Sequence, residues 1–198
     1  MDFRLHFEKA WQVFTAHLAP LLLSTLVLTV ITMVTFGIMA PVCMAGYMQS
    51  LLLALRDGRR PEVRDLFSHM RLFFPLLGFS IVLVLLIYAG FALLVVPGII
   101  VVLAISFGLI YMLPLMTDRS MGLVDAARES IRMAMEPPLA EQLAVVAVYL
   151  VLNSIGNSTG IGLLFTQPYG TLFVLSVYEV KRRRLLTGPG TPPTPPSP

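Results

Sequence analysis

Few side chains in this sequence could do chemistry, and they are widely separated. The three histidines, His6, His17 and His69, lie near the charged ends of apolar stretches. The serines in or near those stretches are Ser24, Ser80, Ser106, Ser154 and Ser176. A serine nucleophile needs a histidine base within hydrogen-bond reach. The sequence has no HExxH motif, and its one GxSxG match, residues 156–160, has no histidine near it in the chain. We therefore predict no catalytic site, no metal site and no bound cofactor, with structural or interfacial roles for the histidines.

Sulfur-containing side chains offer one alternative. Met39, Cys43, Met44 and Met48 would lie on successive turns of a helix, and soft ligands of this kind can hold Cu(I). Methionine at helical spacing is more typical of packing, because its side chain is flexible and apolar. The prediction of no metal site therefore stands.

Charged residues are rare and unevenly spaced, and their spacing determines the expected architecture. Of the 198 residues, 57% are hydrophobic and 13% are charged, about half the charged fraction of a soluble domain. Asp, Glu, Lys and Arg are absent from three stretches, residues 10–55, 72–117 and 142–178, which contain 46, 46 and 37 residues. A crossing helix needs about 20 apolar residues, so each stretch is long enough for two crossings. This composition excludes a nucleic-acid-binding protein and a disordered chain.

Helix-breaking residues divide each apolar stretch near its middle. They are Gly37 and Pro41 in the first stretch, Pro97 and Gly98 in the second, and the segment 156–160 in the third. We therefore predict an all-α, polytopic integral membrane protein with six transmembrane helices arranged as three hairpins. The second crossing, from about residue 42 to 55, is short enough to be re-entrant.

The basic residues give an independent test of this count, because Lys and Arg flanking the crossings favour the cytoplasmic side. If each stretch crosses once, the 14 basic residues divide between the two sides. If each stretch crosses twice, all 14 lie on one side. The second arrangement predicts that both termini are cytoplasmic, that Cys43 lies near the outer face, and that the chain has no cleavable signal peptide.

An amphipathic segment precedes each predicted hairpin, starting near residues 3, 61 and 120. Each has an apolar stripe and a polar side, the pattern of a helix lying on the cytoplasmic surface of a membrane. The spacing suggests repeats over 1–59, 60–118 and 119–184 within a helical membrane domain, 1–184. Amphipathic connectors are common in multi-pass proteins, so the spacing alone does not require a repeat. Residues 185–198 are Pro-rich and predicted to form a disordered cytoplasmic tail.

Two sets of polar residues are candidate functional sites. Basic residues on the predicted inner face could contact anionic lipid head groups; these are Arg56, Arg59, Arg60, Arg64, Lys181, Arg182, Arg183 and Arg184. Gln49, Asn153 and Gln167 fall inside predicted crossings and could line a narrow neutral path, although such residues more commonly form interhelical hydrogen bonds.

These features predict a non-enzymatic membrane protein that contacts lipids or envelope proteins. Membrane lipids are the expected partners, with other membrane proteins or a second copy of the chain as further possibilities. The alternative is a small transporter or channel for a neutral or hydrophobic solute.

Several short motifs carry a family resemblance. They are the amphipathic start over 3–17, the segment 52–58 followed by Asp65-Leu66-Phe67, the segment 94–99, the amphipathic segment 126–130, and the hairpin from Gly160 to Glu179. With these motifs, the chain resembles uncharacterised multi-pass bacterial membrane proteins related to the membrane domain of some glycerophosphodiester phosphodiesterases. The resemblance implies a helical fold in the bacterial inner membrane and no established activity.

Overall fold

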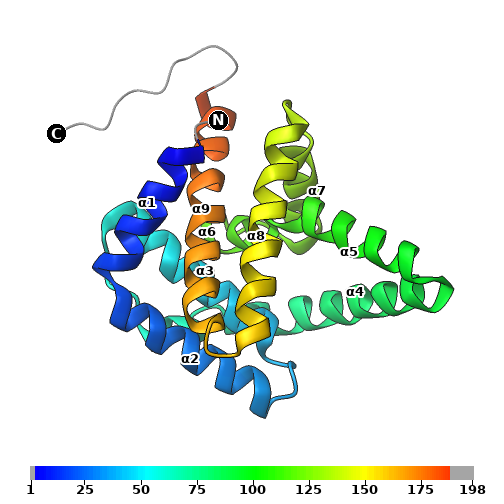
Figure 1. The fold of residues 1–198 in the computed structure, drawn as a ribbon, viewed down its shortest axis with the longest axis horizontal. Coiled ribbons are helices and arrows are strands. Elements are labelled where there is room, and N and C mark those ends of the chain that lie inside the picture. The colour runs from blue at the N-terminus through cyan, green and yellow to red at the C-terminus, as the bar shows by residue number, and fades with distance from the viewer. Residues whose placement is uncertain (1–2, 188–198) are drawn as a thin grey trace.

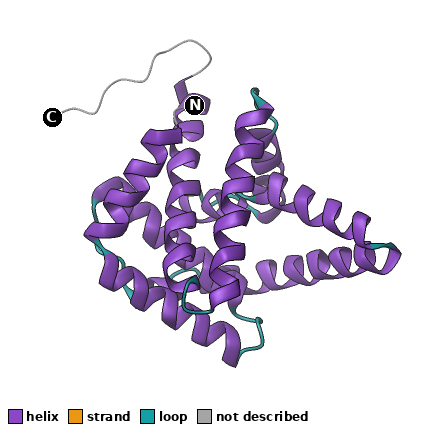
Figure 2. Cartoon of the chain, in the orientation of Figure 1, coloured by secondary structure: helices purple, strands orange, loops and turns teal. Residues whose placement is uncertain are grey.

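A computed structural model describes residues 3–187, and these residues form helices joined by short turns, with no strand among them (Figures 1 and 2). The helices are α1 (Phe3–Ala16), α2 (Leu18–Val34), α3 (Ala40–Asp57), the 3-10 helices η1 (Val63–Phe67) and η2 (Met70–Leu72), α4 (Phe73–Leu93), α5 (Val95–Leu109), α6 (Met112–Asp118), α7 (Leu123–Ala134), α8 (Leu139–Thr159) and α9 (Leu163–Thr187). Residues 188–198 of the predicted tail, and the side chain of Arg184, lie outside the described residues.

Three segments of the described chain are long and apolar enough to cross a membrane. They are Val63–Leu93, which contains α4, Val95–Asp118, which contains α5 and α6, and Leu139–Thr159, which is α8. The pair α1 and α2, bent by 89°, could provide a fourth crossing. The predicted class, an all-helical chain with segments long and apolar enough to span a membrane, is thereby confirmed, whereas the described chain has three or four such segments and the prediction was six.

The core of the molecule forms around α3 and α9. α3 packs against α2, α6 and α9, while α9 also packs against α1 and α8. Tyr47, Leu51 and Phe173 are fully buried in this core. In contrast, the hairpin of α4 and α5 extends to the side of this body, across the direction of α8 and α9 (Figure 1). Most of its large apolar side chains are exposed, as suits contact with lipid.

The turns fall close to the predicted breaks. The first includes Gly37, whose φ of +82° favours glycine. The second turn is at Leu94, three residues earlier than predicted. Pro97 lies in the first turn of α5, where backbone N–H groups have no partner within the helix, so its lack of an N–H costs no hydrogen bond. The third comes after Thr159, at the end of the predicted segment, with Gly160 at a φ of +65°.

The amphipathic segments are present, but they differ in form. α7 is a regular helix, whereas the segment after Pro61 forms the two 3-10 helices. The apolar face of α1 packs partly against the protein. The ring of Phe7 stacks on Phe173 of α9 with centroids 4.6 Å apart, and Phe14 contacts Tyr169 edge-on. An apolar stripe in a sequence shows that a face is buried, without showing whether lipid or protein covers it.

Candidate functional site

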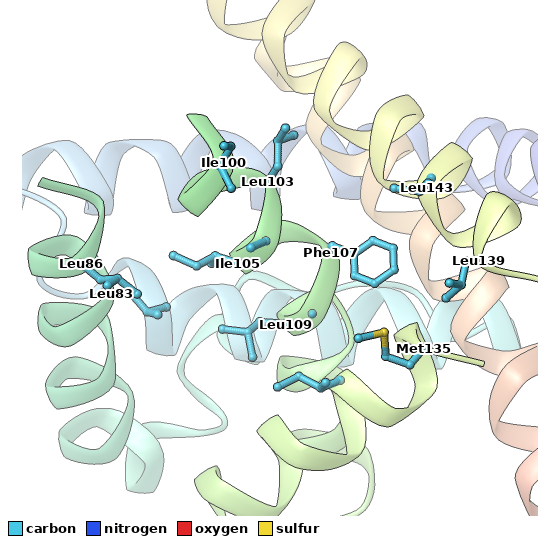
Figure 3. A pocket seen from close by; sticks show the side chains of 13 residues that line it. Leu83, Leu86, Ile100, Leu103, Ile105, Phe107, Leu109, Met135, Leu139 and Leu143 are labelled. Atoms are coloured by element: carbon cyan, nitrogen blue, oxygen red, sulfur yellow. The ribbon is translucent and has the colours of Figure 1, made fainter. Parts of the chain in front are cut away.

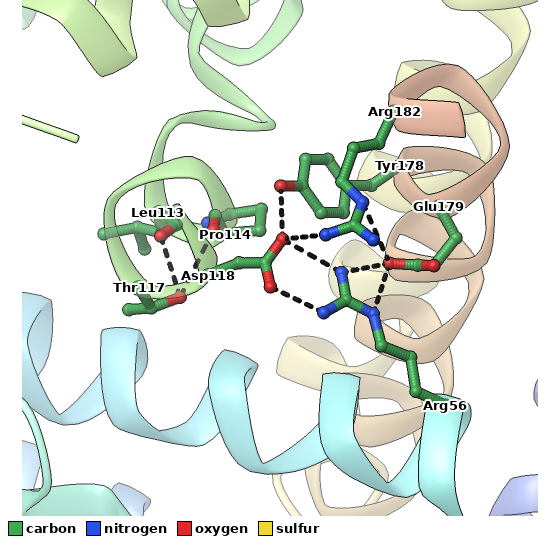
Figure 4. A network of polar contacts seen from close by, with 8 residues as sticks. All are labelled: Arg56, Leu113, Pro114, Thr117, Asp118, Tyr178, Glu179 and Arg182. Atoms are coloured by element: carbon green, nitrogen blue, oxygen red, sulfur yellow. Dashed lines mark hydrogen bonds and ion pairs between the residues drawn. The ribbon is translucent and has the colours of Figure 1, made fainter. Parts of the chain in front are cut away.

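A cluster of ionised side chains joins the ends of α3 and α6 to α9 (Figure 4). Arg56, near the end of α3, donates from Nη1 and Nη2 to the two carboxylate oxygens of Asp118, at 2.5 and 2.9 Å. Its Nε donates to Oε1 of Glu179 on α9 at 2.6 Å, and Nη2 donates to the same oxygen. The side chains of Asp118 and Glu179 are only 6% and 5% exposed. Charge-assisted hydrogen bonds of this kind are roughly twice as strong as those between neutral groups.

Two further residues of α9 complete the cluster. Arg182 donates from Nη1 to Oδ2 of Asp118 at 2.8 Å, and the hydroxyl of Tyr178 donates to the same atom at 3.1 Å. Two arginines therefore face two carboxylates, so the cluster is balanced in charge. Arg56 and Arg182, both predicted as head-group contacts, have their guanidinium groups engaged by protein carboxylates. Asp118 and Glu179 were not among the predicted site residues, although each is the first charged residue after an apolar stretch.

Lys181, another predicted head-group contact, lies in a second buried polar cluster. Its Nζ donates to the carbonyl of Met133 at 2.7 Å and to Oε1 of Gln142 at 2.8 Å. The hydroxyl of Tyr111 also donates to Oε1 of Gln142, at 2.9 Å, and Lys181 Nζ lies 5.4 Å from the centre of the Tyr111 ring. This cluster ties α9 to α7, α8 and the break between α5 and α6.

The same region supplies donors to the last carbonyl groups of α5. Ser130 donates from Oγ to the carbonyl of Gly108 at 2.6 Å, and Gln142 donates from Nε2 to that of Phe107 at 3.4 Å. The last carbonyls of a helix have no intrahelical partner, so side-chain donors are needed where the chain is buried. The break between α5 and α6 is therefore stabilised from α7 and α8.

The predicted basic residues of the segment after α3 differ in their contacts. Arg59 donates to Oδ1 of Asp65 at 2.7 Å, and Arg64 forms an ion pair with Glu62 at 2.5 Å. Arg60 is exposed and forms no ion pair within residues 3–187. Among the predicted basic residues of α9, Arg183 is exposed.

The three amides of the predicted polar path make separate contacts. Gln49 Oε1 is buried with no hydrogen-bond partner in the described chain. Asn153 donates from Nδ2 to the carbonyl of Tyr149 at 2.8 Å, one turn earlier in α8. Nε2 of Gln167 lies 3.7 Å from the sulfur of Met44. None of the three amides lines either of the two cavities described below.

One serine and one histidine come together across the chain. Nδ1 of His6 on α1 lies 2.9 Å from Oγ of Ser176 on α9, a distance suited to a nucleophile and its base. However, these residues are only 7% and 2% exposed, and neither lines a described cavity. The contact therefore supports a role in holding α1 against α9.

The larger cavity is an apolar groove of about 780 Å³ between the α4–α5 hairpin and helices α7 and α8 (Figure 3). Its lining is apolar throughout; the residues are Leu83, Leu86, Ile100, Leu103, Ala104, Ile105, Phe107, Gly108, Leu109, Ile131, Met135, Leu139 and Leu143. All three candidate spans contribute to it. Such a lining can hold hydrocarbon, and it offers no side-chain group for acid–base chemistry or metal binding.

Within residues 3–187, no group of three or more His, Cys, Asp or Glu side chains is placed to hold a metal ion. Comparison with known proteins finds no family model, no curated protein and no solved structure that matches this chain. The resemblance to the phosphodiesterase-linked membrane domains therefore stays a prediction.

Proposed function

We propose that this chain is a non-enzymatic integral membrane protein of the bacterial inner membrane that contacts membrane lipids and holds a lipid acyl chain in the groove between α4, α5, α7 and α8. The apolar lining of this groove carries the proposal. Because the groove lies among the candidate spans, its surroundings in a bilayer are hydrocarbon, and acyl chains are the most abundant apolar molecules there. Water would gain no hydrogen bonds from such a lining.

The proposal also includes a membrane topology, in which the chain crosses six times as three hairpins and both termini lie on the cytoplasmic side. It requires the α4–α5 hairpin, which lies across the direction of α8 and α9 in Figure 1, to turn toward that direction in a bilayer. Two contacts support it. Arg56, Asp118 and Glu179, which end the three apolar stretches, meet in one cluster, as expected if all three hairpins return to the same side. The contact of His6 with Ser176 brings the start of the chain to the same helix that carries Glu179.

A lipid count tests the proposal. We expect native mass spectrometry of the gently solubilised full chain to detect bound phospholipid. Ala104→Trp, which narrows the groove with a large side chain, should reduce the number of retained lipids by one. Ile81→Trp is the matched control, since Ile81 is 52% exposed on α4 and lies outside the groove. A wild-type protein without lipid, or equal lipid counts in Ala104→Trp and the wild type, would contradict the proposal.

The alternative is a small transporter or channel for a neutral or hydrophobic solute. One observation favours it: Oε1 of Gln49 is buried without a hydrogen-bond donor in the described chain, and a polar solute that reached this atom would supply one. Solute flux into proteoliposomes that is lost in Gln49→Leu, with the protein still folded, would support transport.

A further inference from the structure

A second cavity, of about 410 Å³, lies where the first turns of α2 meet the chain that follows α3. One wall comes from α2 and the other from the segment 60–63; the lining residues are Ala19, Pro20, Leu23, Ser24, Arg60, Pro61, Glu62 and Val63. Unlike the apolar groove, this pocket combines charged, polar and apolar side chains. It lies close to the bend between α1 and α2, where an amphipathic helix meets an apolar one.

Arg60 gives this pocket an uncompensated positive charge. Within residues 58–65 there are three arginines and two carboxylates. Arg59 is paired with Asp65 and Arg64 with Glu62, which leaves the guanidinium of Arg60 without a carboxylate partner in the described chain. A guanidinium group matches the geometry of a phosphate, to which it can donate two hydrogen bonds.

Ser24 supplies a second donor. Ser24 is a lining residue of the pocket and is 3% exposed, and its Oγ is buried with no hydrogen-bond partner in the described part of the structure. A buried hydroxyl without a partner is costly, so rotation of this side chain toward a ligand that accepts a hydrogen bond would remove that cost. This observation is independent of the charge on Arg60.

An apolar track continues from the pocket along α2. Leu23 lines the pocket, and Leu26 and Val30 follow it at helical spacing; the three are 53%, 46% and 49% exposed. Residues at positions i, i+3 and i+7 share one face of a helix. A ligand with a phosphate in the pocket could therefore place a hydrocarbon chain along this face.

We infer that this pocket binds the phosphate of an anionic phospholipid, with Arg60 and Ser24 as hydrogen-bond donors and an acyl chain along Leu23, Leu26 and Val30. The inference rests on the proposed lipid contact, and it concerns a site separate from the apolar groove. The exposed track favours a phospholipid over free phosphate, which would leave these apolar side chains uncovered. Glu62 does not oppose binding, because its carboxylate is paired with Arg64.

The test compares two lipids with identical acyl chains, phosphatidylglycerol and phosphatidylcholine, titrated into the detergent-solubilised full chain and followed by native mass spectrometry. We expect the wild type to prefer phosphatidylglycerol, and Arg60→Gln to reduce that preference about tenfold, the equivalent of one charge-assisted hydrogen bond. Arg60→Lys should retain part of it. Ser24→Ala should weaken binding by a few-fold, the equivalent of one neutral hydrogen bond.

Arg128→Gln is the matched control, because Arg128 is exposed on α7, forms no ion pair in the described chain and lies outside both cavities. An unchanged preference in Arg60→Gln, or an equal loss in Arg128→Gln, would overturn the inference. Displacement of the lipid by excess inorganic phosphate would also overturn it, in favour of a free-phosphate site.

Ala104→Trp separates this inference from the proposed function. If Ala104→Trp loses a lipid while Arg60→Gln keeps the head-group preference, the groove holds lipid and the inference about the pocket is wrong. If Arg60→Gln loses the preference and Ala104→Trp loses no lipid, the pocket is supported and the proposal for the groove fails.

Discussion

Arg56 and Asp118 form a bidentate ion pair, with N–O distances of 2.5 and 2.9 Å, between the ends of α3 and α6. Each is the first charged residue after an apolar stretch of 46 residues. Their pairing brings the ends of two predicted hairpins together, and Glu179 adds the third. The cluster therefore connects helices that are far apart in the sequence, and its contribution to stability can be measured.

Removing one partner of this pair should be strongly destabilising. We expect Arg56→Gln to lower the free energy of unfolding by about 3 kcal/mol, because it leaves the carboxylates of Asp118 and Glu179 with fewer donors. Thermal unfolding of the purified protein measures the change. The double variant Arg56→Gln, Asp118→Asn should lose less than the sum of the two single variants. Additive losses, or a wild-type melting temperature for Arg56→Gln, would argue against a coupled pair; Arg128→Gln serves as the exposed control.

Gly46 allows α3 to approach η1 closely. A Cβ atom at this position would lie 2.3 Å from the carbonyl oxygen of Asp65 and 2.6 Å from that of Leu66, so the backbone would have to move. We expect Gly46→Ala to destabilise the protein by about 1–3 kcal/mol, measured as a lower melting temperature. Gly78→Ala is the control, because a Cβ there would meet nothing within 4 Å, and it should be neutral or slightly stabilising. Equal melting temperatures for both variants would contradict the close approach.

Gln142 holds three groups from other parts of the chain through its side-chain amide. Replacing it with leucine keeps the size but removes the acceptor of Tyr111 and Lys181 and the donor to the carbonyl of Phe107. We expect Gln142→Leu to cost about 2 kcal/mol, since buried polar groups would lose their partner. Gln12→Leu, at an exposed position of α1, should have little effect on the same melting curve. Equal melting temperatures for the two variants would show that the buried cluster contributes little to the stability of the protein.

Cysteine labelling tests the predicted topology. In a Cys43→Ala background, a membrane-impermeant maleimide added to intact cells should label Phe36→Cys, Leu94→Cys and Ile161→Cys, which lie in or beside the three outer turns and are 95%, 71% and 74% exposed. Arg60→Cys should react only after the membrane is opened. Labelling of Arg60→Cys in intact cells would exclude the arrangement with all basic residues inside.

Much of the fold follows from the spacing of charges and helix breakers. The apolar stretches predict long helices, and Gly37 marks a turn because its backbone needs a positive φ. Another helix boundary differs from the predicted one because proline is accepted in the first turn of a helix. Pro97 therefore lies inside α5, and the break occurs at Leu94. Such shifts depend on which carbonyl groups find donors in the folded chain.

The candidate site could be predicted only in part. Sequence reasoning singled out Arg56 and Lys181 as basic residues, but their partners come from positions 39 to 123 residues away in the chain. Positive charge at the end of an apolar stretch is equally consistent with a lipid contact and an internal ion pair. The apolar groove has no sequence signature either, because its residues come from four helices and resemble any other lipid-facing residues.

The cluster around Arg56 also constrains the order of assembly during synthesis. Arg56 emerges from the ribosome 62 residues before Asp118 and 123 residues before Glu179. Until those residues are made, its charge has to be solvated by water or lipid head groups at the membrane surface. The cluster therefore reaches its charge balance only after the part of α9 that carries Glu179 and Arg182 is synthesised.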